Sequence, residues 1–242
     1  MINQPENSCE ALEVDRPEIK LRPLTINSWP SEEMHFGIGI QLTNAARRQF
    51  HTTAIYKMNG SLLIGDLQSH LAIGRIEAQV DENIQWIAPD LSVDDQKILA
   101  HKIDAWLIEN PGKIPYSVAH NPGGVVWKEN VWIGTEPGQG LTCATFIVEL
   151  FKELGIPFIS VDDWKKRPGD DEWAIGILKA LSGQMSDEHV EAQKIRIGKT
   201  IRIRPSDVAS AAHLLNKEME EPLGFDEVNP LASVIELQLL KS

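Results

Sequence analysis

Apolar and polar positions alternate or cluster in short runs over the first part of the chain. HFGIGIQL at 35–42 has the apolar character of a strand. Two further runs, HTTAIYKM at 51–58 and SLLIGDLQ at 61–68, are separated by an Asn-Gly pair, the strongest short-range signal of a β-hairpin. A fourth run, IQWIA, occupies 84–88. The pattern predicts a hairpin with neighbouring strands in this part of the chain.

Helical spacing of apolar residues dominates the rest of the chain. Ser92 can cap a helix that runs to residue 109. A second apolar helix is predicted over 141–154, where Gly155 and Pro157 end it. Farther on, the pattern predicts a short hairpin at 125–134, helices at 170–181, 186–195, 207–220 (capped by Ser206) and from 226 or 229 to 240, and short strands at 158–161 and 199–204.

Composition and charge narrow the classes of function. The 242 residues are 42% hydrophobic and 24% charged, which fits one elaborated domain or two small ones. The formal net charge of −12 repels phosphate backbones and anionic lipid surfaces. No apolar run approaches the roughly 18 residues of a membrane span, and no secretory signal pattern precedes residue 30. We therefore expect a cytoplasmic protein without a membrane span and without a nucleic-acid partner.

The two cysteines differ in their surroundings. Cys9 lies in a polar stretch, residues 1–30, which contains four prolines and is expected to be a loosely attached leader. Cys143 stands at the start of the predicted helix 141–154. A helix N-terminus lowers the pKa of a thiol, and the amides of the first turn can hold an oxyanion. Cys143 is therefore the candidate nucleophile, the alternative being a small buried apolar residue.

A nucleophilic cysteine needs a base, and the predicted hairpin supplies a histidine for this role. A two-residue turn places Met58 opposite Ser61, and the same pairing places His51 opposite Gln68. Since alternate residues of a strand share a face, His51, Asp66 and Gln68 are predicted to project from the same side. Asp66 could then fix the tautomer of the imidazole.

The other histidines are weaker candidates. His35 and His70 are the reserves for the base, because one begins an apolar run and the other follows the second hairpin strand. Three more fall on predicted helices and are expected at the surface or its boundary: His101, His189 and His213.

A metal site is the third chemical possibility. Cys143, His51 and Asp66 would supply three zinc ligands, but the chain has no short Cys-x-x-Cys or His-x-x-x-His pair to seed the site. We expect neither a metal nor another cofactor.

The stretch 112–150 resembles the NlpC-type papain-like cysteine peptidase superfamily. The matching residues are Gly112, Pro115 and Tyr116 in GKIPYSV and Cys143 in GLTCATFIVELF. The order of a histidine hairpin, a helix, the tyrosine and the cysteine is similar to that of the circularly permuted branch, which includes lecithin retinol acyltransferase-like proteins. The resemblance covers roughly residues 35–160.

The resemblance implies an α+β fold. Residues 31–160 would form a permuted papain-like core, an antiparallel sheet packed on the cysteine-bearing helix. Residues 161–242 would form a mainly helical extension packed on that core. Within it, Cys143 would be the nucleophile, His51 the base and Asp66 the orienting group, and Tyr116 would line the substrate cleft.

These expectations leave two hypotheses for function. The first is a cysteine hydrolase or acyl transferase that acts on an amide, peptide or ester bond of a peptide or small acyl-bearing substrate. The alternative is a non-catalytic papain-like binding module. It is supported by the sequence around the cysteine, which reads Thr-Cys-Ala-Thr where the superfamily commonly has Asp-Cys-Ser-Gly.

Overall fold

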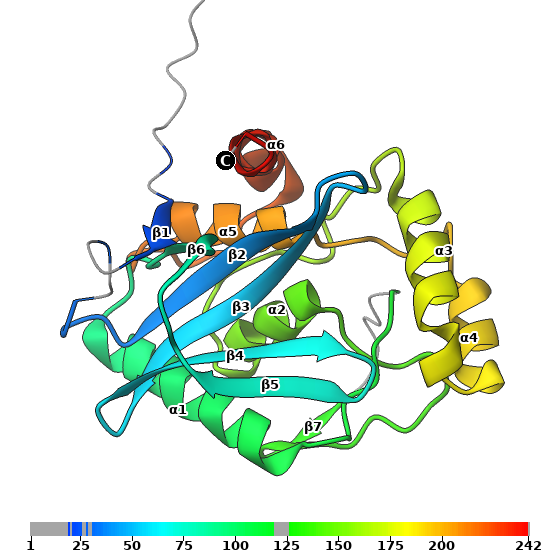
Figure 1. Ribbon diagram of the computed structural model, residues 1–242, viewed down its shortest axis with the longest axis horizontal. Coiled ribbons are helices and arrows are strands. Elements are labelled where there is room, and N and C mark those ends of the chain that lie inside the picture. The colour runs from blue at the N-terminus through cyan, green and yellow to red at the C-terminus, as the bar shows by residue number, and fades with distance from the viewer. Residues whose placement is uncertain (1–18, 20, 26–27, 29–30, 119–125, 242) are drawn as a thin grey trace, which may run out of the picture.

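The fold is α+β, with one large sheet and helices packed against it (Figure 1). This computed structural model describes residues 19, 21–25, 28, 31–118 and 126–241. The predicted leader 1–30, with Cys9, therefore lies largely outside the described residues. No helix in the described part of the chain has both the length and the apolar character needed to cross a membrane.

Six strands form an antiparallel sheet in the order β1-β6-β2-β3-β4-β5. Three of these strands correspond to the runs predicted at 35–42, 51–58 and 61–68, and a fourth contains most of the run at 84–88. The sheet's strands are β1 (Arg22–Leu24), β2 (Phe36–Asn44), β3 (Gln49–Met58), β4 (Ser61–Ser69), β5 (Ala72–Glu77) and β6 (Asp81–Ile87).

The β3–β4 hairpin has the predicted turn and register. Asn59 and Gly60 have φ angles of 51° and 83°, so both central residues adopt the positive φ that a tight two-residue hairpin turn requires. Met58 pairs with Ser61, as predicted, and the same register continues as far as Ala54 and Gly65. The side chains of His51 on β3 and Asp66 on β4 project from the same face, as their hydrogen bond shows.

Within the described residues the chain forms six α-helices, a 3₁₀ turn and a small hairpin. The predicted helices 92–109, 141–154, 170–181 and 186–195 agree with the observed ones to within a few residues. The elements are α1 (Val93–Glu109), β7 (Trp127–Lys128), β8 (Val131–Trp132), α2 (Cys143–Glu153), α3 (Asp170–Leu181), η2 (Ser182–Gln184), α4 (Asp187–Lys194), α5 (Pro205–Leu214) and α6 (Phe225–Leu239).

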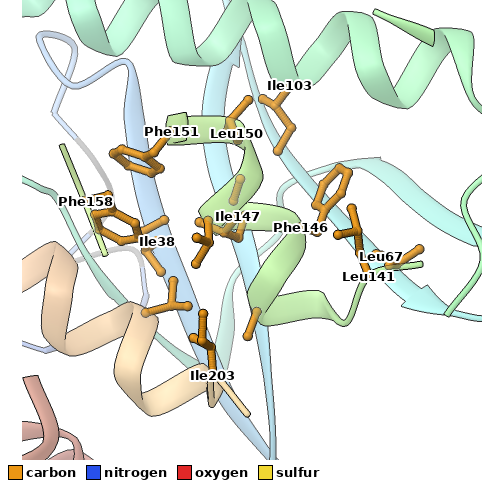
Figure 2. Close-up of a cluster of buried hydrophobic side chains, with 14 of the residues drawn as sticks. Ile38, Leu67, Ile103, Leu141, Phe146, Ile147, Leu150, Phe151, Phe158 and Ile203 are labelled. Carbon is orange, nitrogen blue, oxygen red and sulfur yellow. The ribbon is translucent and has the colours of Figure 1, made fainter. Parts of the chain in front are cut away.

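Helix α2 is the centre of the hydrophobic core. Its residues from Cys143 to Phe151 are all buried, because the helix packs on β3 and β4 and is flanked by α1 and α5. Figure 2 shows its aromatic and aliphatic side chains between those of the sheet, such as Ile38, and Ile103 of α1. A helix that is buried over most of its length requires such an enclosed position. The N-terminus of α2 is thereby fixed at the end of the core.

The segment before α5 differs from the prediction. The predicted strand 199–204 is an irregular loop, and none of the strands that the structure describes forms a ladder with it. Helix α5 begins at Pro205, a residue favoured in the first helical position, so Ser206 is not the cap. The hydroxyl of Ser206 instead donates a hydrogen bond to Glu236 at 2.8 Å.

Three shorter segments also differ. The predicted strand 158–161 is reduced to an isolated bridge between Ile159 and Leu223. Strand β5 was not predicted, because its sequence AIGRIE does not alternate cleanly. Strand β1 lies inside the predicted leader and pairs with β6. Each of these depends on a partner strand that local sequence does not specify.

Candidate active site

The N-terminus of α2 positions Cys143. Thr142 is the N-cap, and its hydroxyl accepts a hydrogen bond from the N–H of Thr145 at 3.1 Å, while the Thr145 hydroxyl accepts from the N–H of Thr142 at 2.8 Å. This reciprocal cap fixes Cys143 as the first residue of the helix. The cap takes the N–H of Thr145, whereas the N–H groups of Cys143 and Ala144 have no carbonyl partner inside the helix and can face a bound oxyanion.

A tight backbone crossing precedes the cap. The N–H of Leu141 donates to the carbonyl of Pro115 at 3.0 Å, which forms part of a parallel bridge between Leu141 and Tyr116. A Cβ atom on Gly140 would lie 2.3 Å from that carbonyl oxygen, so a side chain cannot be accommodated there. The glycine therefore allows the tyrosine segment to lie directly beside the cysteine segment.

Cys143, His51 and Asp66 are brought together as a hydrogen-bonded chain. Nε2 of His51 donates to Oδ2 of Asp66 at 2.7 Å, and the His51 ring also forms a hydrogen bond with the Cys143 side chain. Because Asp66 occupies Nε2, Nδ1 is the ring nitrogen left for the sulfur. The side chains of His51 and Asp66 are only 14% and 12% exposed, which strengthens their interaction.

The charges of the thiol and the imidazole stabilise each other. Burial opposes ionisation of Cys143, but the positive charge and hydrogen bond of His51 and a backbone hydrogen bond from Thr52 lower the pKa of the thiol below its usual value. Burial also opposes a charged imidazole, but the Cys143 thiolate and the hydrogen bond to Asp66 raise the pKa of His51 to about 10. Both shifts favour a thiolate–imidazolium pair over a neutral thiol beside a neutral imidazole.

Tyr116 lies in the wall of the same site, held by its backbone. Its N–H donates to Nδ1 of His70 at 3.3 Å, and its carbonyl accepts from Nε2 of His189 at 2.9 Å. Burial and the nearby Cys143 thiolate raise the pKa of Tyr116, so the ring stays a neutral phenol. The tyrosine can donate a hydrogen bond or pack against a substrate, but it does not supply charge.

Three other histidines have partners away from the thiol. His189 was expected near the surface and is buried, because Nδ1 accepts from the N–H of Gly138 at 3.1 Å while Nε2 holds Tyr116. His70 is engaged with Tyr116. His35 lies at the other end of the hairpin, where its carbonyl accepts from the N–H of Lys57. Of the three candidates for the base, the structure brings His51 to the sulfur.

A pocket of about 180 Å³ opens beside the thiol. Gln68, which the register placed on the face of His51, is part of its wall. Four further residues come from beyond residue 160, in the part of the chain that was expected to form a helical extension outside the site. These four are Trp173, Arg202, Ile203 and Pro205. The pocket continues into a larger groove of about 1080 Å³ that shares part of its wall.

Metal ligands do not cluster in the described residues: no group of three or more His, Cys, Asp or Glu side chains is placed to hold a metal ion.

Comparison with protein-family models, with curated proteins and with solved structures found no match for this chain. The chemistry of the site is therefore derived from its own geometry.

The contact between Asp66 and His51 gives a first testable prediction. Asp66→Asn keeps an acceptor for the Nε2–H of His51 but removes the negative charge, so the pKa of His51 should fall below about 10. Asp66→Ala removes both, and should also slow alkylation of Cys143 at pH 6 by roughly threefold to tenfold through loss of ring orientation. The His51 pKa is measured by NMR of the imidazole protons against pH. An unchanged pKa in both variants would contradict the assigned contact.

Proposed function

We propose that this protein is a cysteine hydrolase or acyl transferase that cleaves an amide, peptide or ester bond through a thioester on Cys143. The observation that carries the proposal is the chain of hydrogen bonds from Asp66 through His51 to Cys143, at the wall of a pocket. A nucleophile, a base and an orienting group in contact are the geometric requirement for such catalysis.

The first half of the reaction forms the acyl-enzyme. The Cys143 thiolate attacks the substrate carbonyl carbon, a carbon–sulfur bond forms, and the carbonyl electron pair moves onto oxygen. N–H groups of the first turn of α2 stabilise this oxyanion. When the carbon–nitrogen or carbon–oxygen bond breaks, the His51 imidazolium gives its proton to the leaving amine or alcohol.

The second half releases the acyl group. Neutral His51 takes a proton from a water molecule, or from an acceptor alcohol or amine, as that group attacks the thioester carbon. The sulfur leaves as the thiolate and the ion pair is restored. Asp66 accepts from Nε2 of His51 throughout, which keeps Nδ1 directed at the reacting atoms. Water gives hydrolysis, whereas another nucleophile gives acyl transfer.

The arrangement also supports a permuted papain-like core. An antiparallel sheet packs on the cysteine-bearing helix, and the histidine hairpin precedes that helix in the chain. Tyr116 lies between them in sequence and beside Cys143 in the pocket. We therefore keep the proposal that residues 31–160 form this core and that a peptide or a small acyl-bearing molecule is the substrate.

Formation of the thioester can be tested without knowing the substrate. Incubation with p-nitrophenyl acetate should release a rapid burst of about one p-nitrophenolate per chain and leave one acetyl group on Cys143, detected by peptide mass mapping. Cys143→Ala should abolish the burst. Cys9, which the sequence places in a polar stretch outside any predicted helix, serves as an internal control and should acetylate much more slowly.

The same experiment separates the two hypotheses. If Cys143 is acetylated no faster than Cys9, the catalytic proposal is wrong and the papain-like binding module becomes the better description. Fast acetylation at Cys143 followed by slow release of acetate supports the acyl-enzyme.

A further inference from the structure

Arg202 is held rigidly beside the candidate nucleophile. It lies in the loop between α4 and α5, and its side chain lines the pocket that contains Cys143. Its backbone carbonyl accepts a hydrogen bond from Nε1 of Trp164 at 3.0 Å. The next residue, Ile203, is 2% exposed and is anchored in the hydrophobic cluster around α2 (Figure 2). The position of Arg202 is thus set by the core.

The guanidinium of Arg202 is short of hydrogen-bond acceptors. Its side chain is only 13% exposed, and Nε is buried without a partner among the described residues. Its ion pair with Asp170 is long, at 3.5 Å, because the same Asp170 oxygen accepts from Nη2 of Arg204 at 2.9 Å. A buried guanidinium with five donors normally has most of them satisfied. This arginine has capacity left for an anion.

Trp173 orients that guanidinium. The ring of Trp173 lies 3.7 Å from the Arg202 guanidinium carbon and also lines the pocket. Such stacking occupies only the face of the guanidinium, so the in-plane N–H groups that do not face Asp170 can bind a planar anion. Burial and the charge of Arg204 lower the pKa of Arg202 to about 10, so the group is still charged at neutral pH.

The groove outside the pocket is also positively charged, although the chain as a whole carries −12. Its wall contains five basic and two acidic side chains, so its charge is opposite to that of the whole molecule. These residues are Arg47, Arg48, Lys179, Arg202 and Arg204, against Glu172 and Glu236. A groove of this charge concentrates anionic ligands at its mouth.

We infer that Arg202 binds a carboxylate of the substrate, close to the carbonyl that Cys143 attacks, and that the substrates are therefore anionic acyl compounds. This inference rests on the proposed function. A carboxylate accepts two parallel N–H bonds from a guanidinium, a geometry that no neutral substrate reproduces. The C-terminal part of the chain would then select the substrate, while the sheet and α2 supply the chemistry.

Alkylating reagents that differ only in charge test this inference directly. N-iodoacetylglycine presents a carboxylate as a peptide terminus does, and N-iodoacetyl-β-alanine presents it farther out, as an acidic side chain does. Each is compared with its neutral methylamide at constant ionic strength. The rate of each carboxylate reagent at Cys143 is divided by that of its methylamide, and this ratio is then divided by the same ratio for a free thiol. For at least one of the two carboxylate reagents, we expect the corrected ratio to be about ten or more.

The variants assign the preference to one residue. Arg202→Gln should reduce the ratio of carboxylate to amide rates by about tenfold. Arg47→Gln is the matched control: it removes the same charge from the outer groove, away from the thiol, and should change the ratio by less than about twofold because solvent screens it. Equal ratios in the parent and in Arg202→Gln would overturn the inference.

A second measurement needs no variant and stands if Arg202→Gln does not fold. Glutarate should protect Cys143 of the parent protein from iodoacetamide saturably, and glutaramide should not. Equal effects of the two compounds would contradict the inference. If Cys143 prefers the anionic reagents but forms no acetyl thioester, the anion site stands and the enzyme proposal is wrong. If Cys143 forms the thioester but shows no preference for charge, the enzyme proposal stands and the anion site is wrong.

Discussion

Iodoacetamide is expected to alkylate Cys143 close to its maximal rate at pH 6, and His51→Ala is expected to slow this reaction by about a hundredfold. A thiol attacks as its thiolate, and at pH 6 a free cysteine of pKa about 8.5 is less than one per cent ionised. The charge and hydrogen bond of His51 oppose the effect of burial and lower the pKa of Cys143. Without that ring, only the backbone hydrogen bond from Thr52 still opposes the effect of burial, so the pKa of Cys143 rises.

The pH profile follows from the signs of the two shifts. The thiolate fraction rises as pH passes the lowered pKa of Cys143, so the rate should increase well below pH 8.5. Since the pKa of His51 is raised to about 10, the imidazolium persists across the neutral range and the rate should stay level until about that pH. In His51→Ala the rate should instead rise only in alkaline buffer.

The measurement is the alkylation rate of Cys143 between pH 5 and 10, read by peptide mass mapping. His101→Ala is the matched control, because His101 is an exposed histidine on α1. Its profile should coincide with that of the parent. A parent profile that rises only near pH 8 to 9, unaffected by His51→Ala, would mean that Cys143 is an ordinary buried thiol.

Asp207→Ala is expected to lower the free energy of unfolding by about 3–5 kcal/mol, because it leaves a buried arginine without its counter-charge. Asp207 is fully buried and accepts two hydrogen bonds from the Arg167 guanidinium, at 2.6 and 3.1 Å. It also accepts the N–H of Arg204 at 2.7 Å, which fixes the loop that precedes α5. The side chain of Arg167 is only 9% exposed.

Urea unfolding followed by circular dichroism measures this loss. Asp226→Ala is the control, since Asp226 pairs with Lys165 at the surface and its side chain is 77% exposed. Removing such an exposed pair changes stability by less than about 1 kcal/mol. A loss in Asp207→Ala no larger than in the control would show that the buried ion pair does not stabilise the loop.

Local sequence determined the part of the site that carries the proposed chemistry. The Asn59-Gly60 turn set the register of the β3–β4 hairpin, and this register placed His51 and Asp66 on one face. The apolar spacing over 141–154 placed Cys143 at the start of α2, and the Thr142 cap fixes that start in the structure. Turn geometry and helix capping act over a few residues, so they can be inferred from the residues themselves.

Tertiary packing decided what surrounds those groups. The loop 199–204 has the alternation of a strand, but no strand among the described residues pairs with it, and Ile203 packs into the core instead. That packing places Arg202 on Trp173 and beside Cys143. His189 is buried because it donates a hydrogen bond to the carbonyl of Tyr116, a residue distant in sequence. Contacts between segments so far apart depend on how the helices pack, and local periodicity carries no record of that.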